Sequence, residues 1–153
     1  FYHLISGLNP ERLLIAAEAI GIGEAALRLA VKYANERVVF DRPIGKNQGI
    51  QFPLAKAYAK LQTAQLMIQK GAWLFDNDHP CGEAANIAKH EAAEAGFDAC
   101  DAAIQTHGGM GYAREFHVER LWREVRLYKL APVSQEMALN YIGEHVLKLP
   151  KSY

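Results

Sequence analysis

The sequence has little cysteine and no net charge. Its two cysteines, Cys81 and Cys100, are too few for a disulfide scaffold and stand in no zinc-binding pattern. Seventeen Lys and Arg residues balance seventeen Asp and Glu residues, which leaves no excess positive charge for nucleic acid or an anionic membrane. We therefore expect no nucleic-acid partner and a reducing location, the cytoplasm, or the mitochondrial matrix in a eukaryote.

Long hydrophobic runs are also missing. No stretch approaches the roughly 18 apolar residues that a membrane-spanning helix needs, and no basic segment followed by an apolar stretch marks a secretory signal. Half of the 153 residues are apolar, enough for the core of one domain. Because the chain starts at Phe1 without a methionine, we expect it to be part of a longer protein.

Apolar residues recur with helical spacing through almost the whole chain, and no window alternates long enough for a convincing strand. Asn9, Pro10 and Glu11 are typical of a helix start, and this helix should continue to about Arg37. A second helix, ending near Asp78, carries large residues seven apart with small ones beside them, as at a helix–helix contact. The large residues are Leu54, Leu61, Ile68 and Phe75.

A third helix is expected from about Glu83 to the Gly108–Gly109 pair, where a glycine can adopt a left-handed turn. Its alanines, three or four residues apart, would let another helix approach closely. Two further helices should cover about 115–130 and begin at Pro132, whereas residues 41–49 read as a loop. The predicted fold is all-α, an antiparallel four-helix bundle with an additional short helix.

The common catalytic motifs are absent. A di-iron site needs Glu-x-x-His pairs, and only Asp76 and His79 come close. A nicotinamide-binding loop is rejected because Arg114 replaces its third glycine and no strand precedes it. Phosphate-loop, metalloprotease and serine-hydrolase motifs are missing. We expect no metal site, and Cys81 and Cys100 as ordinary thiols.

Two segments are more suggestive. The first contains Arg37, Phe40 and Gln48, and the second contains Gln105, Gly108, Gly109 and Gly111. A guanidinium can bind phosphate through two hydrogen bonds, and clustered glycines leave room and free backbone N–H groups for a ligand. On spacing alone, the simpler explanation of a tight turn and a solvated arginine is preferred.

Taken as an ordered set, these motifs resemble the C-terminal helical domain of the acyl-CoA dehydrogenase family of flavoproteins. The resemblance runs from about Gly7 to Val146 and includes Tyr112 and Arg123. It implies an N-terminal helical domain and a middle β-domain outside this chain, and a bundle that forms the core of a homo-oligomer, a dimer or tetramer. It also assigns residues to FAD: Arg37, Phe40 and Gln48 would reach the FAD of a neighbouring subunit, and Gln105, Gly108 and Gly109 would line its adenosine-pyrophosphate part.

The reaction that the resemblance implies is α,β-dehydrogenation of an acyl-CoA thioester, with electrons passing to an electron-transferring flavoprotein. Most members carry the catalytic base in a Glu-Gly-Thr-like segment, where this chain has Pro132; Ser134 matches the threonine that touches flavin. A subgroup resembling the isovaleryl and long-chain enzymes carries the base on the first helix, before an arginine. Glu11 and Arg12 match those positions, so we expect Glu11 as base and Arg12 as the residue that orients or neutralises it.

Several alternatives stay open. A helix start and Arg12 would both favour ionised Glu11, whereas a working base needs a pKa nearer neutral; Arg12 could instead form a surface ion pair. Asp41 replaces the family glycine, so it either points away, pairing with Arg42, or alters flavin binding. The protein could also be a flavin oxidase or monooxygenase of the same superfamily, or a non-catalytic oligomerisation or binding bundle, which Pro132 favours and Glu11 opposes.

Overall fold

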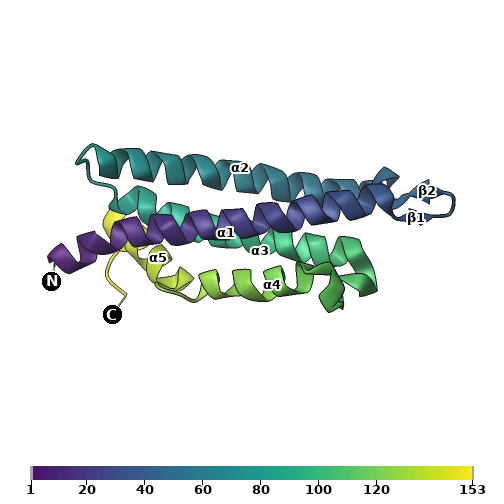
Figure 1. Ribbon diagram of the computed structural model, residues 1–153. Helices are drawn as coiled ribbons and strands as arrows, with labels where there is room; N and C mark the ends of the chain where they lie inside the picture. Colours follow the sequence, from purple (N-terminus) through teal and green to yellow (C-terminus); the bar gives the residue numbers. More distant parts are fainter. Residues whose placement is uncertain (1, 153) are drawn as a thin grey trace.

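The computed structural model describes residues 2–152, with side chains from Gly7 onward. Three long helices, α1 (Tyr2–Glu36), α2 (Gln48–Asp76) and α3 (Gly82–His107), run antiparallel along the length of the molecule (Figure 1). The shorter α4 (Val118–Arg126) and α5 (Gln135–Tyr141) follow, and a π-helical turn (Ile142–Val146) continues α5. The all-α prediction is confirmed, although the last two helices are shorter than expected.

The predicted start of the first helix is wrong. α1 begins at Tyr2, and Pro10 lies inside it. A proline removes one backbone hydrogen bond from a helix, and here that local cost does not end it. Asn9 does not cap the helix but accepts a hydrogen bond from Arg12 Nη1 at 3.1 Å. Glu11 is thus well inside α1, beyond the first turn in which the helix dipole would favour its ionised form.

A small hairpin replaces most of the predicted loop between α1 and α2. Strand β1 (Val38–Val39) pairs antiparallel with β2 (Arg42–Pro43), and a 3₁₀ turn (Ile44–Lys46) leads to Gln48, the first residue of α2. The two turn residues have left-handed backbone, with φ of 51° at Phe40 and 60° at Asp41. Such a two-residue turn suits the twist of a hairpin, and aspartate tolerates it better than phenylalanine.

α3 is the central helix and packs against α1, α2, α4 and α5. The predicted alanine stripe lies on its buried face, as shown by Ala85, Ala88, Ala92, Ala95 and Ala99. At Gly96 the backbone of α1 comes so close that an added Cβ would lie 2.6 Å from the carbonyl oxygen of Ala19. Within residues 2–152, none of the helices has the length and apolar character needed to cross a membrane.

Candidate functional site

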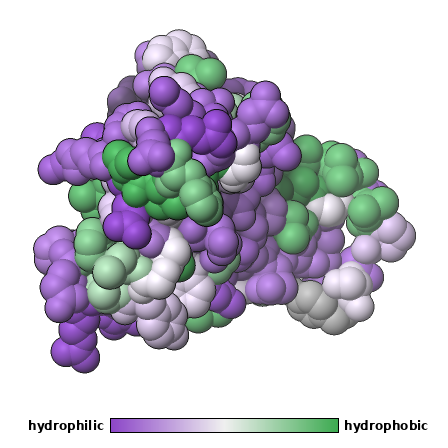
Figure 2. All heavy atoms as spheres, turned by 90° about the vertical axis from the view of Figure 1, so that its right-hand side faces the viewer, coloured by the Kyte–Doolittle hydropathy of each residue, from purple (hydrophilic) through white to green (hydrophobic). Residues whose placement is uncertain are grey.

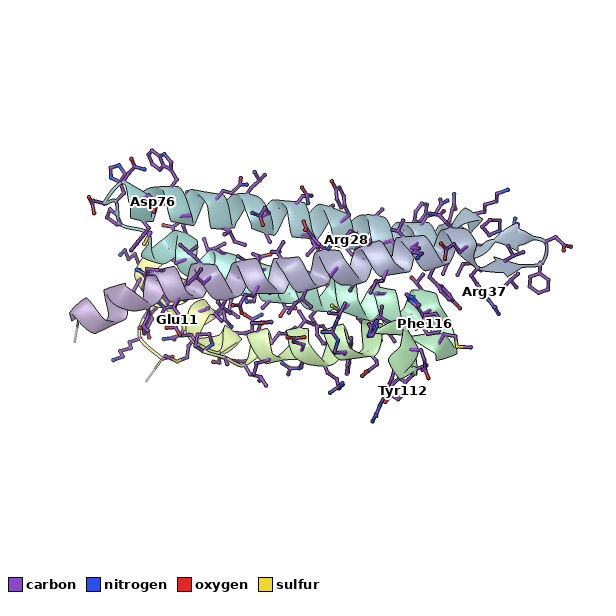
Figure 3. All side chains as sticks on the ribbon, viewed as in Figure 1. Glu11, Arg28, Arg37, Asp76, Tyr112 and Phe116 are labelled. Atoms are coloured by element: carbon purple, nitrogen blue, oxygen red, sulfur yellow. The ribbon has the colours of Figure 1, made fainter. Side chains whose placement is uncertain are left out.

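The predicted site residues lie at opposite ends of the bundle (Figure 3). The first group, Glu11, Arg12 and Ser134, lies where the N-terminal part of α1 meets the starts of α3 and α5; we call this the Glu11 end. The second group lies at the hairpin, the start of α2 and the end of α3; we call this the Arg37 end. Arg37 follows Glu11 by 26 residues, which a helical rise of about 1.5 Å per residue converts to roughly 39 Å. The two groups therefore form two separate sites.

At the Arg37 end, polar side chains are available for a ligand. Arg37, Gln48 and Gln105 are exposed, and none of the hydrogen bonds or ion pairs among the described residues involves their side chains. Gly108 has φ 60° and ψ −138°, a backbone conformation reached almost only by glycine. A Cβ at Gly108 or Gly109 would meet no atom within 4 Å. A ligand could therefore approach this turn closely.

The start of α2 adds positive potential at the same end. This 29-residue helix has no side-chain cap and no acidic residue in its first turn. The unpaired N–H groups of an uncapped helix start carry a partial positive charge. Together with Arg37, the start of α2 makes this end favourable for an anion, although the chain carries no net charge.

Three aromatic rings join the end of α1 to the end of α3. Tyr33 and His107 stack with their ring centroids 4.3 Å apart and 24° between their planes, and Phe116 packs edge-on at 5.7 Å from each. His107 Nδ1 lies 2.8 Å from the carbonyl oxygen of Ala103. The cluster fixes the glycine turn relative to the hairpin. Sequence reasoning missed it because the three residues are far apart in the chain.

The face of the Arg37 end carries exposed apolar side chains. Figure 2 views the molecule from this end and shows apolar patches between polar ones. Phe40 is 93% exposed and Tyr112 is 86% exposed, which is unusual for aromatic residues without a partner. Of the alternatives for Asp41, pairing with Arg42 is not the one observed, because Arg42 donates to Asn47 Oδ1 at 2.8 Å.

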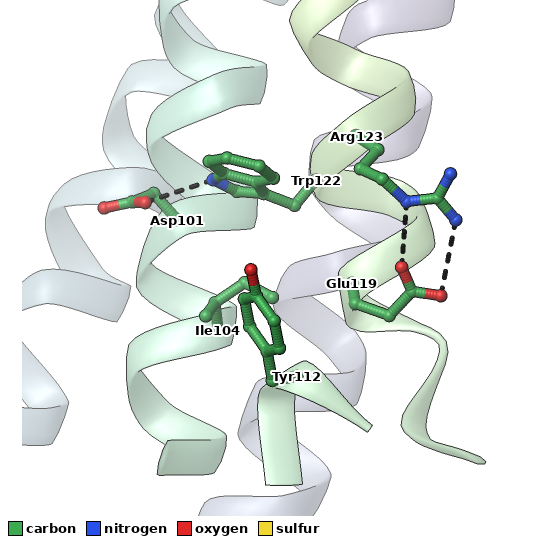
Figure 4. Close-up of a pocket in the computed structure, with 6 residues that line it drawn as sticks. All are labelled: Asp101, Ile104, Tyr112, Glu119, Trp122 and Arg123. Carbon is green, nitrogen blue, oxygen red and sulfur yellow. Dashed lines mark hydrogen bonds and ion pairs between the residues drawn. The ribbon is translucent and has the colours of Figure 1, made fainter. Parts of the chain in front are cut away.

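A cavity of about 240 Å³ lies between α3 and α4, close to the glycine turn (Figure 4). Its lining residues are Asp101, Ile104, Tyr112, Glu119, Trp122 and Arg123. Arg123 pairs with Glu119 at 2.9 Å, and Trp122 donates to Asp101 at 3.1 Å. The charged groups are thus already engaged with one another, and the cavity presents mainly the aromatic faces of Tyr112 and Trp122.

At the Glu11 end, an exposed carboxylate stands beside a buried guanidinium. Glu11 is exposed, whereas Arg12 is only 8% exposed, so Arg12 is not part of a surface ion pair. Burial lowers the pKa of Arg12, and the charges of Tyr141 and Glu11 oppose this shift. Ser134 caps α5, since its Oγ accepts from the backbone N–H of Met137 at 3.3 Å. The structure thus brings Glu11, Arg12 and Ser134 to one end.

The same end contains a polar network that sequence reasoning missed. Gln135 Nε2 donates to Glu94 Oε1 at 2.9 Å, and Lys129 Nζ lies 2.6 Å from the same oxygen. Lys89, one of the fully buried residues, lies nearby on α3. The signal for Lys89 was present, because it stands four residues after Ala85 and three before Ala92, on the predicted small-residue face.

The remaining reactive side chains offer no further site. Cys81 and Cys100 are free and buried, as expected, and burial raises the pKa of Cys100 to about 12. Among the described residues, no group of three or more His, Cys, Asp or Glu side chains could hold a metal ion.

Comparison with known proteins gives consistent matches over nearly the whole chain. The family model described as "Acyl-CoA dehydrogenase, C-terminal domain" matches residues 1–147. Acyl-CoA dehydrogenase fadE12 of Mycobacterium bovis is 46% identical over 153 residues, covering 99% of this chain and 39% of that protein. The 3-(aryl)acrylate reductase of Clostridium sporogenes is 38% identical over 148 residues, covering 97% of this chain and 39% of that protein.

A solved structure agrees with the sequence matches. Butyryl-CoA dehydrogenase from Megasphaera elsdenii superposes with a TM-score of 0.89 and 34% identity, covering 92% of this chain and 37% of that one. The chain therefore spans about two fifths of the length of these relatives.

Proposed function

The chain belongs to the acyl-CoA dehydrogenase family, and we propose that it is the C-terminal helical domain of a flavin-dependent enzyme that dehydrogenates an acyl-CoA thioester. An N-terminal helical domain and a middle β-domain belong to this proposal, since the relatives are more than twice as long as the chain. Relatives named acyl-CoA dehydrogenase and butyryl-CoA dehydrogenase support an acyl-CoA substrate. The cytoplasmic location expected above stays a prediction.

FAD would be held at the Arg37 end. The free side chains there are a guanidinium and two amides, from Arg37, Gln48 and Gln105, and these groups suit an anionic pyrophosphate. The open backbone of Gly108 and Gly109 leaves room beside them, and the exposed ring of Phe40 provides an apolar surface. The main support for this assignment is that these three side chains lie at one end of the bundle and form no hydrogen bonds with the other described residues. When bound, FAD supplies the hydride acceptor of the reaction.

Glu11 is proposed as the base that removes the α-proton of the thioester. Its carboxylate is exposed, so a substrate can reach it, and Arg12 lies directly beside it. The alternative position in the chain carries Pro132, which has no basic group. Ser134, at the same end, would contact the flavin ring.

The separation of the two ends supports a shared active site in a homo-oligomer, a dimer or tetramer. Roughly 39 Å of helix prevents one chain from placing Arg37 and Glu11 around the same reacting atoms. A second chain would supply the flavin-binding residues. α2 offers a surface for this assembly, because Phe52, Leu66 and Trp73 follow one face of it and are 55%, 66% and 59% exposed. An electron-transferring flavoprotein is the proposed electron acceptor.

The test uses the full-length enzyme that carries this domain. We expect flavin absorbance in the purified protein and acyl-CoA-dependent dye reduction, which Glu11→Gln should reduce by at least about a hundredfold without loss of flavin. Arg37→Ala should lower the FAD content and leave the fold intact. Near-normal turnover of Glu11→Gln would refute the role of this residue. A folded parent protein without flavin would favour a non-catalytic bundle, the alternative that Pro132 supports, and reduction of oxygen as efficient as that of dye would identify an oxidase.

A further inference from the structure

Lys89 is the largest completely enclosed side chain among the described residues, with an exposed fraction of 0%. Its Nζ has no hydrogen-bond partner among them. It lies on the alanine-rich face of α3, where an apolar side chain would match the surroundings. Because a buried ammonium without a direct partner destabilises a fold, packing alone does not explain a lysine at this position.

The charges around Lys89 come from three helices. Burial lowers the pKa of Lys89; the charge of Glu136 opposes this shift, that of Arg12 adds to it, and that of Glu94 opposes it. Arg12 belongs to α1 and Glu136 to α5. Lys89 therefore lies in electrostatic range of both helices that flank the Glu11 end.

Other buried polar atoms share this junction. Arg12 Nε, Asn86 Oδ1 and Gln135 Oε1 are buried and have no hydrogen-bond partner among the described residues. Asn86 lies one turn before Lys89 on α3, whereas Arg12 and Gln135 come from α1 and α5. Buried polar groups are normally paired. Their concentration where α1, α3 and α5 meet marks a polar junction inside an otherwise apolar core.

We propose that Lys89 is a positioning residue of the catalytic end, which fixes Arg12 of α1 and the first turn of α5 relative to each other. This inference rests on the proposed function. Arg12 directly follows Glu11, and Ser134 lies two residues before Glu136. Lys89 would therefore act on Glu11 through Arg12 and on Ser134 through Glu136.

The physical effect has two parts. The charge of Lys89 repels that of the buried Arg12, whose guanidinium donates to Asn9 Oδ1 and is attracted by Glu11. Hydrogen bonds to its own backbone N–H and to Ser134 lower the pKa of Glu136 at the start of α5, and the charge of Lys89 adds a weaker attraction in the same direction. Replacement of a buried charge by an apolar side chain of similar volume is often neutral or stabilising. A lysine buried at such a cost is expected to serve position rather than stability.

The test compares stability with turnover in the full-length holoenzyme. We expect Lys89→Met to leave the melting temperature unchanged or raise it, and to leave the FAD content unchanged. The kcat should fall by about tenfold to a hundredfold, the effect of a small misplacement of catalytic groups, with a much smaller change in KM. Lys89→Arg, which keeps the charge, should recover part of the lost kcat. Lys70→Met, at an exposed position of α2, is the matched control and should keep wild-type kcat.

A second variant tests the proposal even if Lys89→Met does not fold. Glu136 is exposed, so Glu136→Gln weakens the same link without disturbing the core, and it should lower kcat about threefold with an unchanged melting temperature. A kcat within twofold of wild type in both variants, or a fall in kcat that only follows loss of folded protein, would overturn the proposal. Wild-type turnover and the Glu11→Gln variant, measured in parallel, show whether the proposed function itself has failed.

Discussion

At the scale of single residues, Glu94 is the carboxylate of α3 that binds Lys129 and Gln135. Its Oε1 accepts a hydrogen bond from Gln135 and lies 2.6 Å from Lys129 Nζ. Burial opposes the ionisation of Glu94, but the hydrogen bonds from Lys129 and Gln135 and the charge of Lys129 outweigh it, and the pKa of Glu94 is lowered. The ionised form therefore stabilises the folded state.

This lowered pKa makes stability depend on pH in a defined direction. An unfolded glutamate has a pKa of about 4.3; Glu94 contributes stability above that pH and loses it as the pH falls through its folded-state pKa. We expect Glu94→Gln to lower the free energy of unfolding by roughly 1 kcal/mol at pH 7 and by less at pH 3. Urea unfolding followed by circular dichroism measures both values. Glu91→Gln, at an exposed position of the same helix, is the control, and an equal loss at both pH values would contradict the assignment.

At the scale of elements, the backbones of α1 and α3 approach closely at two glycines. An added Cβ at Gly23 would lie 2.8 Å from Leu61 Cδ2 and 2.9 Å from Gly96 Cα, and one at Gly96 would lie 2.6 Å from the carbonyl oxygen of Ala19. Backbone atoms cannot rotate away as the end of a side chain can. Any side chain at Gly96 must therefore push the two helices apart.

We expect Gly96→Ala to destabilise the fold by about 1–3 kcal/mol, the usual effect of overpacking, although alanine is the better helix former. Gly21→Ala is the matched control, because Gly21 is exposed on α1 and an added Cβ there meets nothing within 4 Å. That variant should gain up to about 1 kcal/mol from helix propensity. Thermal unfolding followed by circular dichroism compares the stability of the two variants. Equal changes in melting temperature would show that the close contact at Gly96 does not restrict the side chain at this position.

Helical periodicity predicted the body of each long helix, because α3 buries its alanine face and α2 buries Leu54, Leu61 and Ile68. Phe75, the last residue of the predicted row, is 47% exposed, because it lies one residue before the end of α2. The ends were less predictable. Asn9 and Pro10 have the chemistry of a helix start, yet α1 extends past them, since a single lost backbone hydrogen bond does not stop a helix that continues on both sides. The hairpin was missed because two-residue strands show no alternation. Lys89 stands on the predicted small-residue face, so its burial could have been predicted, whereas its position among the ends of α1 and α5 depends on tertiary packing.

The candidate site residues could be selected from the sequence, but their positions in the fold could not. Motifs and family resemblance selected Glu11 and Arg37, whereas the three-dimensional fold shows that they lie at opposite ends of the bundle. The aromatic cluster of Tyr33, His107 and Phe116 joins three different elements, so no local sequence pattern predicts it. Sequence motifs select the candidate residues, and the length of the helices between them determines which candidates lie close enough to act together.

At the scale of the whole molecule, the exposed apolar face of α2 predicts self-association. Phe52, Leu66 and Trp73 are separated by multiples of seven residues and lie on the face opposite the buried Leu61 and Ile68. A monomer rarely exposes a continuous row of large apolar side chains, and a helix row with this period packs well against another helix.

We therefore expect the 153-residue chain alone to be a folded, helical oligomer that retains little or no FAD and has no turnover, because the proposed N-terminal and middle domains would supply the rest of the flavin and substrate sites. Light scattering after size-exclusion chromatography should show more than one chain per particle. Leu66→Glu should convert it to smaller particles with unchanged helical content, because a charge buried in the contact costs more than one left in water. Thr63→Glu, at an exposed position of α2 beside this row, should keep the wild-type size. A monomeric wild type would contradict the expected self-association, and stoichiometric flavin retained through purification would contradict the expected loss of FAD.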